Sequence, residues 1–186
     1  MRKTKKPLSL EYQLAYAVIG DDVGEVRRLL EAGANPNTRE EIDSDGNNYS
    51  LLHIACSHCQ GKIAELLIRH GARVKTSTKG GYSPLHAAVY YTMPDTIRLM
   101  VEKGANINRY GKNAAPPLHD AVQSGSIDMV ELLVELGADV SQVYKGKTAL
   151  EYVDMLVRNS FLWEISSKKI TEFLSVATEK AKLERA

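Results

Sequence analysis

A 33-residue repeat runs through most of this chain and limits the folds open to it. Four segments end on an apolar run followed by Gly-Ala, and the glycines of these endings, at spacings of 38, 33 and 33 residues, are Gly33, Gly71, Gly104 and Gly137. Four segments begin around a leucine, and these leucines, at spacings of 33, 33 and 32 residues, are Leu52, Leu85, Leu118 and Leu150. Two patterns in fixed register predict a stack of similar units, each burying its apolar face against its neighbours.

Each predicted unit begins with one helix and ends with another. Hydroxyl residues that can cap a helix stand at Ser50, Ser83 and Thr148. Pro84 and Pro117 fall in the first helical turn, where no amide partner is lost. The closing glycines follow helical runs of apolar residues, as expected where the chain adopts a left-handed conformation to leave a helix. A unit is therefore two antiparallel helices plus a projecting turn.

The start and end sequences match those of a known repeat. The starts read Ser-Leu-Leu-His-Ile-Ala at 50–55, Ser-Pro-Leu-His-Ala-Ala at 83–88 and Pro-Pro-Leu-His-Asp-Ala at 116–121, and the last begins Thr-Ala-Leu at 148–150. The chain thus resembles the ankyrin repeat family, whose unit opens on Thr-Pro-Leu-His-x-Ala and closes on Leu-Leu-x-x-Gly-Ala. The resemblance implies an all-α ankyrin-repeat solenoid of stacked helix-turn-helix units with projecting β-hairpin-like fingers.

The resemblance covers a single domain, residues 10–186, after a basic N-terminal tail at 1–9. Five units are predicted, the first and last being divergent caps with a polar outer face. Their approximate ranges are 10–37, 50–75, 83–108, 116–141 and 148–183. An acidic insertion at 38–49 lengthens the first finger, and the segment 159–165 is expected to form an extended turn or a lengthened helix in the last unit.

Composition is that of an ordinary soluble globular protein. Hydrophobic residues at 44% and charged residues at 25% exclude a disordered or fibrous chain, and a net charge of +1 would not draw it to nucleic acid or a membrane surface. The longest apolar run, Leu14 to Ile19, is far shorter than the roughly 18 residues of a membrane span. Two cysteines, Cys56 and Cys59, form no disulfide framework, so a cytoplasmic location is expected; the nucleus, or a host cytosol reached without a classical signal peptide, stays open.

The resemblance implies a binding scaffold that uses its finger tips and the exposed positions of each first helix as a concave face. Mapping by register gives the candidate partner-binding residues Tyr49, His58, Lys79, Tyr82, Tyr90, Tyr91, Lys112, Gln123, Tyr144 and Lys147. The tyrosines at 49, 82, 90 and 91 are the leading candidates, since tyrosine is enriched at binding hot spots. Alternatively, Tyr90 or Tyr91 fills the groove between neighbouring first helices, because two adjacent helical residues cannot both face one way.

Charge changes sign along the fingers. The first finger is acidic and supplies four further candidate binding residues, Glu40, Glu41, Asp43 and Asp45. The later fingers are basic, with Arg73, Lys75, Lys79, Arg109, Lys112, Lys145 and Lys147. A partner of complementary polarity could be steered and held in register by this gradient. Ordinary solvated fingers would carry the same residue types, which is the alternative interpretation.

One short segment contains four potential metal ligands, His53, Cys56, His58 and Cys59. However, His53 is also the histidine of the start motif, and Cys56 stands where the motif needs a small buried residue. No second ligand pair stands at metal spacing. We therefore predict no metal, no cofactor and no catalytic residue in this chain.

The sequence predicts a non-enzymatic, monomeric protein–protein interaction module that inhibits or sequesters a protein partner of unknown identity. No small-molecule substrate, nucleic acid or membrane is expected as a ligand. Two alternatives stay open. One is a metal-binding or enzymatic role around the His53 to Cys59 cluster. The other is a polyanion or membrane-surface adaptor that uses Lys3, Lys5, Lys6 and the basic fingers.

Overall fold

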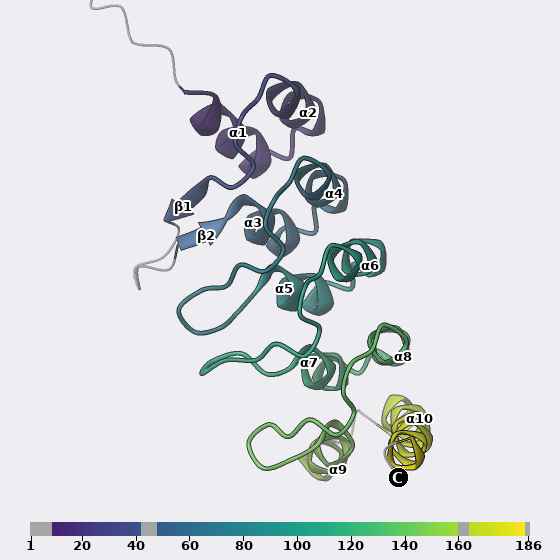
Figure 1. Cartoon of the computed structure of the whole chain (residues 1–186). Coiled ribbons are helices and arrows are strands. Elements are labelled where there is room, and N and C mark those ends of the chain that lie inside the picture. The colour runs from purple at the N-terminus through teal and green to yellow at the C-terminus, as the bar shows by residue number, and fades with distance from the viewer. Residues whose placement is uncertain (1–8, 42–47, 160–163, 185–186) are drawn as a thin grey trace, which may run out of the picture.

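The computed structural model describes residues 9–41, 48–159 and 164–184 of the chain. Its helices form pairs stacked in one column (Figure 1). The first helices of the pairs are α1 (Leu10–Ile19), α3 (Leu51–Ser57), α5 (Pro84–Tyr90), α7 (Pro117–Ser124) and α9 (Ala149–Asn159). The second helices are α2 (Val23–Glu31), α4 (Gly61–Arg69), α6 (Pro94–Glu102), α8 (Ile127–Glu135) and α10 (Glu164–Leu183). The predicted all-α repeat solenoid is confirmed.

The helices form two layers that share one apolar core. First helices pack on first helices from α1 to α9, and second helices pack on second helices, as α2 does on α4 and α4 on α6. The largest side chains that this stacking removes from water include Leu14, Leu29, Leu52, Leu67, Leu85, Ile97, Leu133 and Ile170. Because they come from successive units, the core is continuous along the column. No helix of the described residues is long and apolar enough to cross a membrane.

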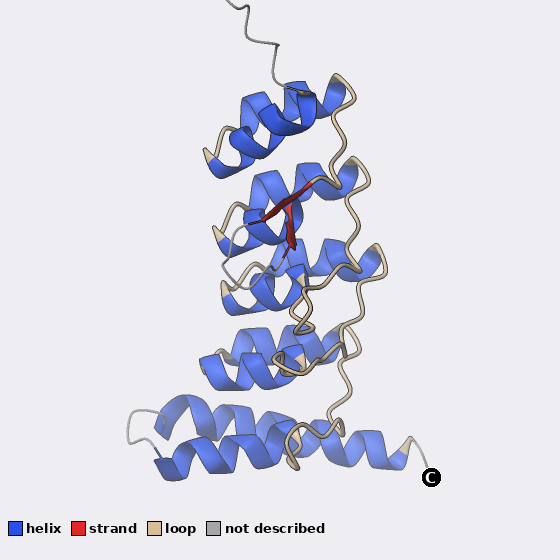
Figure 2. Ribbon diagram, turned by 90° about the vertical axis from the view of Figure 1, so that its left-hand side faces the viewer, coloured by secondary structure: helices blue, strands red, loops and turns tan. Residues whose placement is uncertain are grey.

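The connections between units project as fingers on the side of the first helices (Figures 1 and 2). We number them in chain order as first (38–49), second (76–82), third (109–115) and fourth (142–147). In the first finger, strands β1 (Arg39–Glu41) and β2 (Asn48–Ser50) pair antiparallel, with Glu40 opposite Tyr49. The third and fourth fingers each hold one antiparallel bridge, between Gly111 and Ala114 and between Tyr144 and Lys147.

Local sequence accounts for the ends of the helices. The Ser50 hydroxyl accepts the His53 backbone N–H at 3.3 Å, and so satisfies a donor that the first turn of α3 leaves open. Pro84 begins α5, where its missing N–H is not needed. After α4, Gly71 takes a φ of +89°, a conformation that a side chain would oppose. The predicted starts and endings are therefore physical caps of these helices. Of the segment 159–165, expected to form an extended turn or a lengthened helix, Asn159 ends α9 and residues 164–165 begin α10, whereas residues 160–163 lie outside the described residues.

A row of buried histidines joins each unit to the next. The Nε2 atom of His53 lies 3.2 Å from the carbonyl oxygen of Tyr82, His86 Nε2 lies 3.0 Å from that of Ala115, and His119 Nε2 lies 3.1 Å from that of Lys147. Since a carbonyl only accepts, each Nε2 carries the hydrogen. The Nδ1 atoms of His53 and His86 then accept from the hydroxyls of the preceding serines, at 2.8 and 2.7 Å.

The third of these histidines lacks half of this arrangement. Pro116 stands where the two earlier units carry Ser50 and Ser83, and proline offers neither a hydroxyl nor an N–H. His119 is only 1% exposed, so water does not replace the missing hydroxyl, and its Nδ1 atom is buried without a hydrogen-bond partner. A buried acceptor left open in this way lowers stability by about 1 to 3 kcal/mol.

Pro116→Ser is therefore expected to raise the free energy of unfolding by about 1 kcal/mol. The serine hydroxyl would donate a hydrogen bond to His119 Nδ1, and this gain exceeds the loss that follows because the unfolded chain is more flexible without the proline. Urea unfolding followed by circular dichroism measures this. Pro116→Ala is the matched control, because it removes the proline without adding a hydroxyl. If the serine variant is no more stable than the alanine variant, its hydroxyl does not reach His119.

Candidate functional site

The fingers and the exposed residues of the first helices form one surface, which we call the finger face. Two tyrosines one repeat apart, Tyr49 and Tyr82, lie half-buried at the base of the first and second fingers. Their rings pack on two histidines of the buried row that joins the units. The centroid distances are 5.7 Å from Tyr49 to His53 and 5.3 Å from Tyr82 to His86. Each tyrosine thus offers only part of its surface to a partner, and the remainder covers the junction between units.

Tyr90 and Tyr91 lie at the C-terminal end of α5 and are far more open. Tyr90 is 66% exposed and Tyr91 is 41% exposed. Their rings meet edge to face at a centroid distance of 5.0 Å. Neither side chain is therefore buried in the groove between neighbouring helices, which was the alternative role for this pair.

Asp120, on α7, belongs to the same surface and was missed by the sequence analysis. Its half-buried carboxylate has no ion-pair partner among the described residues. Burial raises the pKa of Asp120 to about 7, because a carboxylate loses hydration there without gaining a cation. Asp120 occupies the variable position of the Leu-His-x-Ala motif, where the two preceding units have the buried residues Ile54 and Ala87. A charged residue at a position that is apolar and buried in the two preceding units is the sequence signal that could have identified Asp120.

Four of these residues form one group, the tyrosine–aspartate cluster, made of Tyr49, Tyr82, Tyr91 and Asp120. Burial raises the pKa of Tyr82 to about 12, and the negative charges of Asp120 and of ionised Tyr91, Cys56 and Tyr49 add to the rise. Tyr49 belongs to the first finger, Tyr82 and Tyr91 flank α5, and Asp120 lies on α7, so the cluster spans three neighbouring units.

The other predicted binding residues lie around this cluster. His58, Lys79, Lys112 and Gln123 are exposed, whereas Tyr144 and Lys147 are half-buried in the fourth finger. Tyr144 packs on His119 at 5.8 Å, so it repeats the arrangement of Tyr49 and Tyr82. In the acidic finger, Glu40 and Glu41 belong to β1, but their side chains lie outside the described part of the structure. Asp43 and Asp45 lie outside it altogether.

The second and third fingers are held together by backbone contact between glycines. The Asn113 N–H donates to the Gly80 carbonyl at 3.0 Å. A Cβ built on Gly81, whose φ is +93°, would lie 2.5 Å from the Cα of Gly111, so no side chain fits between the two fingers. The contact fixes the spacing of the two fingers that carry Lys79 and Lys112.

The suspected metal ligands do not form one site. Both ring nitrogens of His53 are used in hydrogen bonds, and Cys56 is completely buried. Burial raises the pKa of the Cys56 thiol far above its usual range, which disfavours the thiolate that would bind a metal. His58 and Cys59 are instead exposed at the end of α3. Within the ranges that the structure describes, no three His, Cys, Asp or Glu side chains are grouped as a metal site would require.

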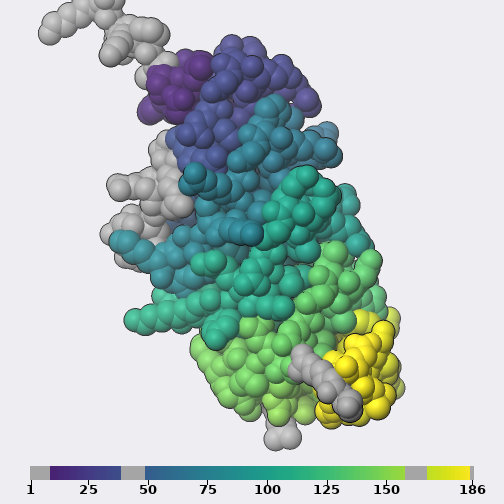
Figure 3. Space-filling view, in the orientation of Figure 1, coloured from purple at the N-terminus to yellow at the C-terminus, as the bar shows by residue number. Residues whose placement is uncertain are grey.

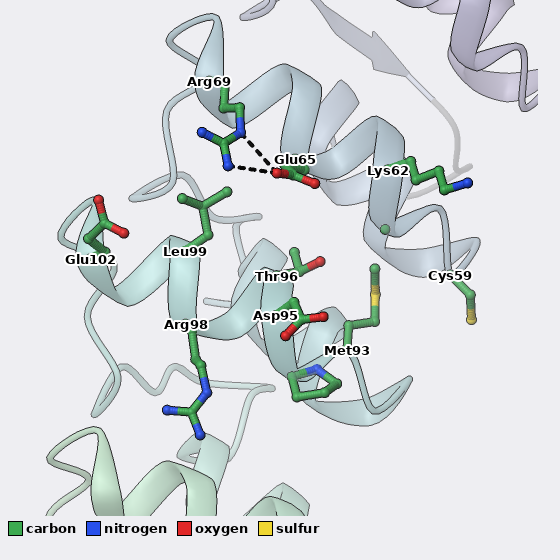
Figure 4. A pocket seen from close by; sticks show the side chains of 12 residues that line it. Cys59, Lys62, Glu65, Arg69, Met93, Asp95, Thr96, Arg98, Leu99 and Glu102 are labelled. Atoms are coloured by element: carbon green, nitrogen blue, oxygen red, sulfur yellow. Dashed lines mark hydrogen bonds and ion pairs between the residues drawn. The ribbon is translucent and has the colours of Figure 1, made fainter.

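A groove of about 590 Å³ lies on the opposite layer, between α4 and α6 (Figure 4). Its charged side chains are partly paired within the protein, as Glu65 is with Arg69 at 2.7 Å and Arg98 with Glu135 of α8 at 3.1 Å. These pairs are exposed and of mixed sign, so the groove presents no dominant charge to a ligand. The space-filling view shows the second and third fingers projecting from the side of the column away from α4 and α6 (Figure 3).

A family model for ankyrin repeats, built on three copies of the unit, matches two overlapping stretches of the chain, residues 13–111 and 75–144. Together they span residues 13–144, which is more than half of the 186 residues. They include the first three start motifs, at 50–55, 83–88 and 116–121, together with the closing glycines and the tyrosine–aspartate cluster. The chain therefore belongs to the ankyrin-repeat family, whose members are generally protein–protein interaction modules.

Proposed function

We propose that this protein is a non-enzymatic module that binds a protein partner through the finger face and thereby inhibits or sequesters it. The observation that carries the proposal is the tyrosine–aspartate cluster, in which partly exposed aromatic rings share the finger face with a carboxylate that no described cation neutralises. Tyrosines supply large contact area at low entropic cost, and such anchors dominate binding energy at protein interfaces.

The carboxylate of Asp120 favours a partner that presents a basic side chain. Burial already disfavours the charged form of this group, and an arginine or lysine placed beside it would supply the missing counter-charge. The surrounding tyrosines would contact the aliphatic stem of that side chain or stack on its guanidinium. Binding would then shift Asp120 fully to its charged form and release protons near neutral pH, because a group with a pKa of about 7 is only partly ionised there.

The neighbouring fingers would complete the interface. Lys79 and Lys112 are exposed on the two fingers joined by the glycine contact, so they would meet acidic groups at the edge of the partner. The acidic finger, with Glu40, Glu41, Asp43 and Asp45, would contact basic groups. A preformed solenoid needs little reorganisation, and an interface of about 800 Å² on each side is expected.

Tyr91→Ala is expected to weaken the complex by about 2 kcal/mol, a loss of about 30-fold in affinity, with a smaller change in stability, because 41% of this residue is exposed. Affinity capture from lysate of the source organism identifies the partner, and calorimetry with that partner measures the effect. Val176→Ala, which shortens a 71% exposed side chain on α10, outside the finger face, is the control. Equal affinity of the Tyr91→Ala variant and wild type would remove the cluster from the interface.

A further inference from the structure

Arg109, in the third finger, breaks a pattern that the other units keep. Its position is five residues after the closing glycine, where the other units have Thr38, Thr76 and Gln142. Each of these neutral side chains donates to a backbone carbonyl: that of Asn35 at 2.9 Å, Arg73 at 3.2 Å and Asn108 at 2.9 Å, respectively. Arg109 instead places a permanent positive charge at this site.

The guanidinium of Arg109 is only partly satisfied by the protein. Its Nη2 donates to the Ser77 hydroxyl at 2.5 Å, whereas its Nε is buried without a partner. No carboxylate of the described residues lies within ion-pair distance of it. A half-buried charge without a counter-charge opposes folding, and a bound anion would remove that penalty.

Arg109 lines a partly open cavity of about 310 Å³ formed by residues of the segments 74–85 and 104–109, which we call the loop-edge cavity. A second cation, the exposed Lys75, lines the same cavity, and its Nζ lies 3.5 Å from where a Cβ on Gly104 would stand. Lys75 has no ion-pair partner within the described residues. The absence of a side chain at Gly104 therefore leaves room for this ammonium group.

The remaining polar groups of the cavity are also suited to an anion. The Oδ1 of Asn106 accepts the Asn108 N–H at 3.0 Å, which fixes the amide and leaves the Nδ2 hydrogens to donate. No acidic residue lines the cavity. An adjoining groove of about 660 Å³ shares Lys75, adds Arg73 and Lys103, and is likewise lined by no acid.

We propose that the loop-edge cavity binds a phosphate monoester or inorganic phosphate, with Arg109 and Lys75 as its charged ligands and the Asn106 amide as a further donor. A phosphate dianion offers three acceptor oxygens and nearly two negative charges, which matches the two cations and the amide that line this cavity. This site is separate from the tyrosine–aspartate cluster and does not rest on the function proposed for it.

Titration of the isotope-labelled full chain, followed by amide NMR shifts at constant ionic strength, tests the site. The probes are inorganic phosphate, a phosphoserine peptide and acetate. We expect saturable phosphate-dependent shifts at residues 75–77 and 104–109, and binding that is at least about tenfold weaker in Arg109→Gln and in Lys75→Gln. Phosphate should also raise the melting temperature of wild type but not of Arg109→Gln.

Lys62→Gln is the control, since it removes one exposed positive charge from the groove between α4 and α6. It should bind phosphate as wild type does. A phosphoserine peptide that binds about tenfold more tightly than inorganic phosphate would assign the ligand to a phosphorylated protein. Equal affinity would assign it to free phosphate. The proposal is overturned by shifts that do not saturate, by equal weakening in Lys62→Gln, or by acetate binding as tightly as phosphate.

Discussion

Leu85→Ala is expected to lower the free energy of unfolding by about 2 to 5 kcal/mol. Leu85 is the leucine of the second start motif, and it is 1% exposed in α5, between α3 and α7. The substitution removes apolar contacts and leaves a cavity that the two neighbouring units cannot close, because each is fixed by its own stacking. Urea unfolding followed by helical circular dichroism measures the loss.

Leu183→Ala makes the same chemical change at the end of α10, where the side chain is 78% exposed. It should change stability by less than about 0.5 kcal/mol. A Leu85→Ala protein that unfolds at the same urea concentration as wild type would mean that this leucine does not face the core and that the repeat register is wrong.

The second large effect is on the pH dependence of stability, in which two buried groups oppose each other. Burial lowers the pKa of His86 from 6.5 to about 4, so between these values the unfolded chain binds a proton that the folded chain does not. Stability from this group is complete above pH 6.5 and is lost as the pH falls toward 4. The loss is on the order of 3 kcal/mol.

Asp120 acts in the opposite direction over nearly the same range. Its pKa is raised from 3.8 to about 7, so between these values the folded chain binds the additional proton. Its contribution to stability therefore increases as the pH falls from 7 toward 3.8, by an amount also on the order of 3 kcal/mol. In the wild-type protein the two contributions largely cancel.

Asp120→Asn should reveal the cancellation. The variant is expected to be more stable than wild type by about 3 kcal/mol at pH 7.5, where wild type buries a charge, and to lose that advantage by pH 4.5. Urea unfolding of both proteins at the two pH values gives the difference between their free energies of unfolding. The contributions of all other titrating groups cancel in this difference. Parallel pH profiles would show that Asp120 does not hold its proton near neutrality.

The repeat period made the fold predictable because it is built from local signals. Ser50 and Pro84 mark helix starts and Gly71 marks an ending through constraints that act within a few residues. The same signals repeat four times in register, so an ambiguity in one unit is resolved by the next. The candidate binding surface was only partly predictable, because the exposure of a residue such as Tyr82 depends on how its ring packs in three dimensions, here against His86.

Sequence reasoning missed Asp120 and did not single out Arg109 among the basic residues of the fingers, and both depart from the repeat. Asp120 stands among positions that are apolar in the neighbouring units, and Arg109 stands among neutral ones. Their chemistry follows from the absence of a nearby counter-charge, and this is a property of three-dimensional packing. A one-dimensional pattern reports the residue that is present but not the partner that it lacks.

The contact between Gly81 and Gly111 limits which repeat units of this solenoid could be exchanged independently of one another. Helix pairs could be exchanged wherever their apolar faces match, because stacking demands only size and shape. The second and third fingers are more restrictive. Their backbones approach so closely that each finger needs a glycine in the other at the point of contact. The units that carry them would therefore have to be duplicated, deleted or transplanted as a single block.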